Sequence, residues 1–487
     1  MSTTTPASPP TQAGGFTLET NGINVITEAE RKGSPKDLFW PWCAANVSVF
    51  GLSYGAYFLG FGISAVQALV AGLIGTVVSF LLVGFASLAG KRGSAPTMIL
   101  TRSSFGVRGG ALPTALSYIL LVGWEIILVA LATLAVATVA ARLGWGSGDG
   151  LKIVAFLVVI AIVMAAGMLG FDVIMKVQTW ITYATVVLTV GYVVLTWDHI
   201  SWSAVSAVPS GPLQGVLGAL ILGITAFGLG WVNSAADYSR YLPRSASGAG
   251  VVGWTTFGAS VAPILLVLFG VPLAASDADL SAKIGSDPIG ALTTILPTWY
   301  LIPFAIVAIL GLVGGAVLDI YSSGLTLLTL GLKIPRWSAA GLDGVICILG
   351  TVYVVWIAEN FLWTFMAFLI VVGVPVAAWC GVFLADLALR HQAYDETALY
   401  DPRGRYGSVN WVSIALVLVG TFLGWGLVTN ATEGFGWLGY LLDPIGLGGR
   451  EGGWAYANLG VLVAIVVGFA GYYLLCAGRV RRQESAA

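Results

Sequence analysis

Apolar residues occupy most of this chain in long runs that are separated by short polar segments. A helix needs about 20 mostly apolar residues to cross the hydrocarbon core of a bilayer. The runs predict twelve membrane-spanning helices, at residues 39–62, 65–89, 111–141, 151–170, 175–197, 214–238, 249–273, 301–331, 340–358, 360–389, 409–429 and 455–477. The pattern therefore predicts an all-α integral membrane protein.

Composition supports a lipid environment. Of the 487 residues, 57% are hydrophobic and only 9% are charged, whereas soluble domains carry about 25% charged residues. A soluble domain this apolar would expose large adhesive patches. The net charge of −1 gives no reason to expect a nucleic-acid partner.

The two ends of the chain are polar. Residues 1–37 are rich in Ser, Thr and Pro and lack the basic-then-apolar order of a signal peptide. We expect them to form a disordered cytoplasmic tail, followed by a single transmembrane domain at 38–478 and a short cytoplasmic tail at 479–487.

The distribution of basic residues predicts the orientation. With the N-terminus in the cytoplasm, 18 of the 22 lysines and arginines fall inside, and 4 (Arg142, Lys152, Lys283 and Arg450) fall outside. Cytoplasmic loops carry the excess of positive charge in membrane proteins. We therefore expect a multi-pass protein of the cell membrane (inner or plasma membrane) with both termini in the cytoplasm. The oligomeric state is not predicted.

Sequence signals of catalysis are lacking. There are only two histidines, and the chain has no HExxH, GxxxxGK[ST] or GxSxG motif. The four cysteines lie in apolar runs without metal-ligand spacing, as expected of buried thiols: Cys43, Cys347, Cys380 and Cys476. We expect no enzyme activity, no cofactor and no metal site.

Glycines interrupt two of the predicted spans. The first span contains Gly51-Leu-Ser-Tyr-Gly55, and the sixth contains Phe227-Gly-Leu-Gly-Trp231 with Gly223 just before it. Transporters commonly build their binding site from interrupted helices near the midplane. The two interruptions are five helices apart, as a five-plus-five inverted repeat requires. The alternative is tight helix packing by small residues.

Acidic residues inside the predicted membrane are costly and point to function. Glu125 lies near the middle of the third span, beside Trp124. It is placed to bind a proton or to accept hydrogen bonds from a solute; the alternative is a polar contact with a neighbouring helix. Asp319, in the inner half of the eighth span, is a candidate for a coupling-ion path or for a structural pair.

Two pairs of opposite charge lie at inner ends of helices. Asp237 and Arg240 lie at the inner end of the sixth span, and they are candidates for a structural i,i+3 pair or for an inner gate. Asp386 and Arg390 end the tenth span, where the structural pair is favoured.

Polar and aromatic groups fall near the predicted bilayer centre. Asn46 and Ser48 in the first span are unfavourable in lipid unless they face a cavity or another helix. Trp124, Phe227 and Trp231 lie away from the interfacial belts that aromatic residues usually occupy. Their flat faces suit a planar ring.

Four ordered motifs carry a resemblance to a known family. They are Gly90-Lys-Arg-Gly-Ser-Ala-Pro-Thr-Met-Ile-Leu-Thr-Arg-Ser-Ser-Phe-Gly-Val-Arg-Gly109 with Leu112-Pro113 and Gly123-Trp124, then Ala236-Asp-Tyr-Ser-Arg-Tyr-Leu-Pro243, then Tyr321-Ser-Ser-Gly-Leu325, and finally Ala385-Asp386, Tyr394-Asp395, Leu399-Tyr400, Gly404-Arg-Tyr406 and Asn410-Trp411. From Trp40 to about Leu475 the chain resembles the nucleobase:cation symporter 1 family, and most closely its cytosine and purine–cytosine permease branch.

The resemblance implies a fold like that of the sodium-coupled amino-acid transporters, with two inverted five-helix repeats and two peripheral helices. It also implies secondary active uptake of a nucleobase, such as cytosine or a purine, by alternating access and driven by a cation gradient. The alternative is a permease of the same fold for allantoin- or hydantoin-type or other small nitrogenous solutes, and less favourably for amino acids or amines.

The family pattern also assigns roles. By resemblance, Trp124 stacks on one face of the base, and the break in the sixth span supplies the other face. Family members usually carry an aromatic residue at the position of Gly228, so we expect Phe227, or less favourably Trp231, to replace it. Asn46, Ser48 and Glu125 are expected to meet the polar edge of the base.

The cation site departs from the family pattern. Sodium-coupled members carry hydroxyl residues where this chain has Gly314-Gly315, and two glycines offer no side-chain oxygen to a hard cation. Asp319 stands where fungal relatives often have Asn, and Glu125 is an added acid. We therefore expect coupling to H⁺ rather than Na⁺, with Glu125 or Asp319 as the proton carrier.

Overall fold

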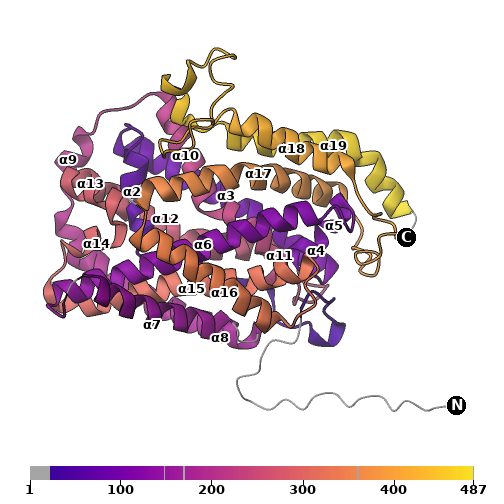
Figure 1. The fold of residues 1–487 in the computed structure, drawn as a ribbon, viewed down its shortest axis with the longest axis horizontal. Helices are drawn as coiled ribbons and strands as arrows, with labels where there is room; N and C mark the ends of the chain where they lie inside the picture. The colour runs from indigo at the N-terminus through magenta and orange to yellow at the C-terminus, as the bar shows by residue number, and fades with distance from the viewer. Residues whose placement is uncertain (1–21, 147, 168–170, 359–360, 486–487) are drawn as a thin grey trace.

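The computed structural model describes residues 22–485 apart from 147, 168–170 and 359–360. All regular secondary structure in this described part is helical. The long helices lie roughly side by side across the molecule (Figure 1). They are α3 (Ala65–Gly93), α6 (Ala111–Arg142), α7 (Asp149–Gly167), α8 (Phe171–Thr196), α12 (Gly248–Ser276), α15 (Leu301–Thr329), α16 (Arg336–Trp356), α17 (Phe361–Leu389), α18 (Trp411–Trp425) and α19 (Gly460–Ser485).

Two further spans are split into pieces. The first consists of α1 (Phe39–Asn46) and α2 (Phe50–Leu59). The sixth consists of α10 (Leu213–Ala226), the 3-10 helix η4 (Gly228–Ser234) and α11 (Ala235–Ser239). Together with the long helices they account for each of the predicted spans.

The outer surface of the bundle is suited to lipid. Eight of the described helical spans are long and apolar enough to cross a membrane, and α18 and the described part of α16 are shorter apolar helices. Large apolar side chains project outward, including Val66, Trp180 and Leu474, which are 69%, 74% and 78% exposed. A helix satisfies its own backbone hydrogen bonds, which is a condition for crossing lipid. The chain is an all-helical integral membrane protein.

The helices pack as two related sets of five. The first set is α1/α2, α3, α6, α7 and α8, and the second is α10/η4/α11, α12, α15, α16 and α17. Contacts come in matching pairs: α2 packs on α12 as α10 packs on α3, and α8 packs on α15 as α17 packs on α6. Each contact in one pair becomes the other contact when the two sets of five helices are exchanged, as expected of a five-plus-five repeat. The two additional helices, α18 and α19, pack on α17 (Figure 1).

The break in the first span lies earlier than the sequence suggested. Residues 47–49 separate α1 from α2, whereas Gly51 and Gly55 lie inside α2. A Cβ atom on Gly55 would come within 2.2 Å of the Gly270 backbone, so this glycine permits α2 and α12 to touch. The interruption predicted from these two glycines is therefore wrong in position, and their role is close packing. The break in the sixth span lies where predicted.

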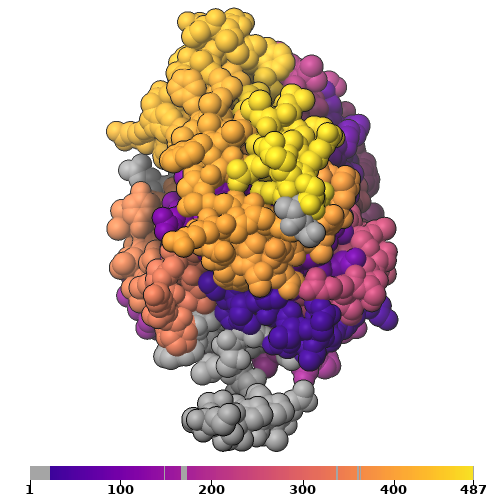
Figure 2. Space-filling model, turned by 90° about the vertical axis from the view of Figure 1, so that its right-hand side faces the viewer, coloured from indigo at the N-terminus to yellow at the C-terminus, as the bar shows by residue number. Residues whose placement is uncertain are grey.

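One end of the molecule carries most of the basic loops, and we call it the basic end. It consists of residues 22–38, the α3–α6 connection with α4 (Thr97–Leu100) and α5 (Arg102–Phe105), the α11–α12 connection, the α17–α18 connection and the end of α19 (Figure 2). The opposite end carries α9 (Trp202–Ala207), α13 (Ala278–Ser286) and α14 (Pro288–Thr293).

Residues 22–37 differ from the disordered tail expected of them. They contain the 3-10 helix η1 (Glu28–Glu30) and most of the 3-10 helix η2 (Pro35–Leu38), and they pack on the basic end. The Arg31 side chain is 2% exposed and hydrogen-bonds the Leu242 carbonyl and the Ser94 hydroxyl. A hydrogen bond from Arg244 lowers the pKa of the Glu28 carboxyl. Residues 1–21 of the predicted tail lie outside the described part.

The contact between α2 and α12 gives a stability prediction. A Cβ atom on Gly270 would lie 2.3 Å from the Leu52 carbonyl oxygen, whereas one on Gly253, in the same helix, meets nothing within 4 Å. We expect Gly270→Ala to destabilise the protein by about 1–3 kcal/mol through overpacking. Gly253→Ala is the matched control, and helix propensity favours it by about 1 kcal/mol. Melting temperatures in detergent test this; equal values for the two variants would contradict it.

Candidate functional site

A cavity of about 60 Å³ lies in the centre of the bundle, at the breaks of the first and sixth spans. Its walls come from α1 and α2, α6, the α10–η4 junction and α15. The lining residues are Ala45, Asn46, Ser48, Phe50, Gly51, Tyr54, Trp124, Leu128, Ala226, Phe227, Trp231, Gly311, Leu312 and Asp319. The structure thus gathers most of the predicted binding residues around one small space.

Trp124 forms one wall of the central cavity. Its indole meets the rings of Phe365 and Phe368 on α17 edge to face, with centroids 5.4 Å and 6.1 Å away. It also rests against the break of the sixth span, because a Cβ atom on Gly230 would lie 2.8 Å from the indole nitrogen. The indole is therefore held in place from two sides while lining the cavity.

Phe227 and Trp231, from the break of the sixth span, also line the cavity. Phe227 packs on Tyr54 with ring centroids 4.5 Å apart, and Trp231 meets Trp42 edge to face at 5.7 Å. Gly228 does not line the cavity: it lies against α3, where its N–H donates to the Ser79 hydroxyl over 3.0 Å. A Cβ atom there would be 2.3 Å from the Ser79 backbone, so an aromatic residue at this position does not fit.

Asn46 and Ser48 bring polar atoms to the break of the first span. The Asn46 amide donates to the Trp42 carbonyl over 2.8 Å, and the Ser48 hydroxyl accepts from the Phe50 N–H at 3.3 Å. These bonds satisfy backbone groups that the interrupted helix leaves free. Both side chains line the cavity, as predicted.

Three acidic side chains are buried together beside the cavity. Asp319 lines it, and Glu125, one residue after Trp124, is completely buried with neither carboxyl oxygen hydrogen-bonded to a donor among the described residues. The third is Asp343 on α16, which interacts with both. Asp343 was not predicted from sequence. The rule that singled out Glu125 and Asp319 applies to it equally, because it lies in the predicted span at 340–358.

The Gly314-Gly315 pair lies against α1. A Cβ atom on Gly314 would be 2.9 Å from the Ala44 carbonyl oxygen, and one on Gly315 would be 3.5 Å from that of Ala45. The amide nitrogen of Gln178, from α8, donates to the Gly314 carbonyl over 2.9 Å. Gln178 was not predicted from sequence. Among the described residues, no group of three or more His, Cys, Asp or Glu side chains is arranged to hold a metal ion.

Asp237 and Arg240 are both buried at the basic end, but they bind different partners. Asp237 accepts hydrogen bonds from the backbone N–H and the hydroxyl of Thr97, at 2.8 Å and 2.9 Å. Arg240 donates to the Gly22 carbonyl and to the hydroxyls of Tyr241 and Tyr321. Within the described part of the chain, no salt bridge joins the two. They tie the α3–α6 connection and residue 22 to the sixth span.

Asp386 and Arg390 form the expected intrahelical ion pair, with 2.8 Å between Nη2 and Oδ1. Asp386 also accepts hydrogen bonds from the hydroxyls of Ser103 and Tyr472, each at 2.7 Å. Ser103, like Thr97, belongs to the motif that joins the second and third spans. That motif therefore fastens both α11, through Asp237, and the end of α17, through Asp386, at the basic end.

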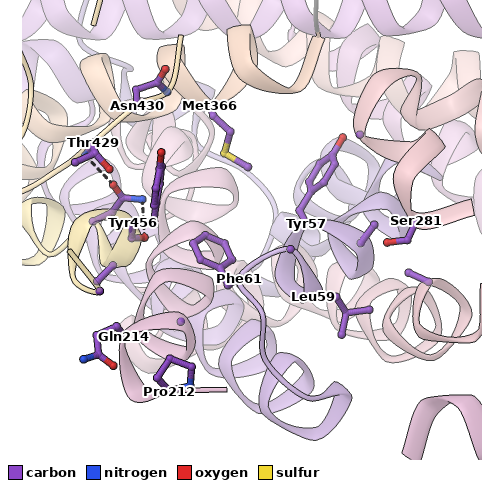
Figure 3. Close-up of a pocket in the computed structure, with 18 of the residues that line it drawn as sticks. Tyr57, Leu59, Phe61, Pro212, Gln214, Ser281, Met366, Thr429, Asn430 and Tyr456 are labelled. Carbon is purple, nitrogen blue, oxygen red and sulfur yellow. Dashed lines mark hydrogen bonds between the residues drawn. The ribbon is translucent and has the colours of Figure 1, made fainter. Parts of the chain in front are cut away.

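A larger cavity of about 1020 Å³ lies towards the opposite end, and we call it the vestibule. Tyr57, Phe61, Met366 and Tyr456 surround its open space, together with Gln214, Ser281 and Asn430 (Figure 3). Tyr456 is 48% exposed, so the vestibule reaches the surface. Burial raises the pKa of the nearby Asp287 carboxyl, which caps α14 and faces Tyr57.

Stacked and edge-on aromatic rings separate the vestibule from the central cavity. Phe50 contacts the rings of Tyr54, Tyr57, Phe361 and Phe365, with centroids 5.2–6.4 Å apart. Tyr57 lines the vestibule, and Phe50 and Tyr54 line the central cavity. The central cavity is thus closed from the vestibule by side chains alone.

Comparison with known proteins adds independent information. Residues 25–442 match the family model described as "Permease for cytosine/purines, uracil, thiamine, allantoin". A putative purine-cytosine permease of Bacillus subtilis (strain 168) is 27% identical over 82% of this chain and 86% of its own length. The cytosine permease of Escherichia coli (strain K12) is 30% identical over 80% of this chain and 86% of its own.

The fold also matches a solved structure. Mhp1, a nucleobase-cation-symport-1 family transporter in a closed conformation with bromovinylhydantoin bound, superposes with a TM-score of 0.72. The match covers 96% of both chains at 19% sequence identity. This likeness supports the arrangement of inverted repeats described above.

The buried ion pair at the basic end yields a second stability prediction. Arg390→Met leaves the buried Asp386 carboxylate without its cation, and breaking such a pair costs about 3–5 kcal/mol. Lys152→Met is the matched control: it removes the cation of the Lys152–Asp149 pair, whose side chains are 34% and 72% exposed. We expect that change to cost less than about 1 kcal/mol. Melting temperatures that fall equally in both variants would show that the Asp386–Arg390 pair is not structural.

Proposed function

This chain belongs to the family of permeases for cytosine/purines, uracil, thiamine and allantoin, and we propose that it takes up a nucleobase, such as cytosine or a purine, in symport with protons. The family consists of transporters, so the protein is a permease and not an enzyme. The observation that carries the proposal is the central cavity, which Trp124 on α6 lines together with Phe227 and Trp231 from the break of the sixth span.

Stacking on the aromatic rings would supply affinity for any base, and hydrogen bonds to the polar edge of the base would supply specificity. A base between Trp124 and Phe227 gains stacking energy of about 1–3 kcal/mol, which every base shares. Choice among bases must come from its polar edge, because an unmatched buried polar group costs about 1–3 kcal/mol. Asn46, Ser48 and Glu125 are the groups proposed to meet that edge.

The cavity must widen to admit a base. Its volume of about 60 Å³ is far below the roughly 300–1,000 Å³ of typical small-molecule pockets. We propose that the base enters from the vestibule when the rings of Phe50, Tyr54 and Phe365 part. The basic end, held together by Asp237 and Arg240, would act as the inner gate and open only afterwards. With the basic end in the cytoplasm, as the charge distribution predicts, this order produces uptake.

The residues around Gly314 favour protons over sodium. Sodium binds oxygen ligands, and here the two glycines supply none from side chains, while the Gln178 amide nitrogen bonds the Gly314 carbonyl. Glu125 or Asp319, both buried next to the cavity, is the proposed proton carrier.

A second candidate class has a specific observation in its favour. Mhp1, which superposes along nearly the whole chain, is bound to bromovinylhydantoin in its closed conformation. A hydantoin has a nearly flat five-membered ring, which allantoin also contains, and the same aromatic walls would accept it. Amino acids and amines fit less well, because they offer no ring to stack.

Uptake into proteoliposomes tests the function and the coupling ion. We expect labelled cytosine or a purine to accumulate against its gradient when the outside is acidic, and not when a sodium gradient alone is imposed. Competition by cytosine, adenine, hypoxanthine, uracil, allantoin and amino acids ranks the candidate solutes. Accumulation driven by sodium alone, with no response to pH, would reject proton coupling. Displacement only by allantoin would favour the second class.

The stacking role of Trp124 gives a mutational prediction. Trp124→Ala should weaken the binding of all accepted bases together, by roughly 5- to 150-fold, because it removes about 1–3 kcal/mol of stacking. Trp124→Phe should retain most of the affinity. Trp180→Ala, which removes an indole that is 74% exposed on the lipid side, is the control and should bind normally. Unchanged affinity in Trp124→Ala would remove the stacking role.

A further inference from the structure

Asp343 is an acid that neither the binding site nor the fold accounts for. It lies two turns into α16 and is completely buried, although Leu342 and Val345 on the same helix are 44% and 53% exposed. The Ser323 hydroxyl on α15 donates a hydrogen bond to its Oδ2 atom. Its Oδ1 atom is buried without a donor among the described residues. A side chain so oriented faces the centre of the protein and not the lipid.

The buried carboxyl groups of Glu125 and Asp343 are brought near each other where α16 packs on α6, and they interact electrostatically. A carboxylate can only accept hydrogen bonds, whereas a carboxylic acid can also donate one. A hydrogen bond between two carboxyl groups therefore requires a proton on one of them. Both Glu125 oxygens and the Asp343 Oδ1 atom are buried without a hydrogen-bond partner among the described residues, so a proton held between the two carboxyl groups would supply the donor that they lack.

The surroundings of the pair contain no compensating cation. The groups that interact with it are Asp319 and Ser323 from α15, Tyr118 from α6 and Cys347 from α16. No lysine or arginine in the described part of the chain forms a salt bridge with any of the three acids. Two carboxylates side by side in a dry interior repel strongly, and each loses its hydration. In the closed state at least one of the two carboxyl groups must therefore carry a proton.

We propose that Glu125 and Asp343 hold one proton in common and that this pair is the binding site of the coupling proton, an inference that rests on the proposed function. Binding adds H⁺ to a pair of carboxylates: one O–H bond forms, its hydrogen bond reaches the other carboxylate, and the charge of the pair falls from −2 to −1. Release reverses this and returns the proton to water.

The position of the pair links the proton to alternating access. Asp319 lines the central cavity and interacts with both members of the pair, so water in the cavity brings protons to them past Asp319. Tyr118 lies two helical turns before Glu125, towards the basic end, and its buried hydroxyl, which has no hydrogen-bond partner among the described residues, interacts electrostatically with Asp343. The proton-free pair needs water, so it empties only when the site is open to one side.

Infrared titration of the purified protein in lipid tests the shared proton without any substrate. The wild type should show a carbonyl-stretch band of a buried carboxylic acid that disappears as the pH rises. Glu125→Gln and Asp343→Asn should each shift the pH at which the remaining band titrates, by similar amounts, because each removes half of one site. Asp198→Asn, which removes a carboxyl group that is 84% exposed, is the control and should leave the titration of the buried band unchanged.

Independent carboxyl groups would behave differently. If each single variant removed its own band and left the midpoint of the other unchanged, the shared proton would be ruled out. If Asp319→Asn, and not Asp343→Asn, reproduced the shift seen in Glu125→Gln, the partner of Glu125 would be Asp319 and the proposal would fail. These readings hold for folded variants, whose melting temperatures are measured alongside.

A transport experiment separates this inference from the proposed function. In proteoliposomes with radiolabelled cytosine, wild type should accumulate the base under an acid-outside gradient. Asp343→Asn should lose this accumulation at least tenfold yet still exchange labelled for unlabelled cytosine. Accumulation by Asp343→Asn equal to that of wild type would overturn the inference and leave the proposed function standing. A wild type that does not respond to pH would refute proton coupling, whereas the infrared titration would still decide whether the pair shares a proton.

Discussion

A helix can be interrupted in the middle of a bilayer only where the backbone groups that it frees find other partners, and the rest of this structure follows from that constraint. At residues 47–49 the partners are the Ser48 hydroxyl and nearby carbonyls, and at the sixth-span break one partner is the Ser79 hydroxyl. Both breaks lie against the same small cavity. Polar atoms reach the centre of an apolar molecule because the two chain breaks bring them there.

Close approach of backbones decides which side chains reach that centre. Gly228 touches the backbone of α3, and Gly230 faces the Trp124 indole. A larger side chain would not fit at Gly228 or Gly230, and the neighbouring Phe227 and Trp231 line the cavity. The same effect places Gly55 and Gly270 at the contact of α2 with α12. In lipid, where apolar side chains gain little by leaving their surroundings, such close packing is a main source of helix association.

Charges are used in opposite ways at the basic end and at the centre. At the basic end every buried charge discussed has partners: Asp386 is bound by Arg390 and two hydroxyls, and Asp237 by Thr97. The motif between the second and third spans supplies Thr97 and Ser103, which explains why its residues are polar in an apolar protein. At the centre, Glu125, Asp319 and Asp343 have each other and no cation. Full pairing stabilises a fixed structure, whereas incomplete pairing leaves a group free to exchange a proton.

The sequence alone determined the fold class, the number of spans and the general place of the site, because runs of about 20 apolar residues can be satisfied only as membrane helices. It also identified Trp124, Phe227, Trp231, Asn46, Ser48 and Asp319, which all line the cavity. Only the tertiary structure placed the first break at 47–49, since a glycine in a helix looks the same in sequence whether it ends the helix or packs it. Only the structure brought Asp343 to Glu125 and Gln178 to Gly314. These contacts join helices 136 or more residues apart, and no local pattern encodes a distance between separate spans.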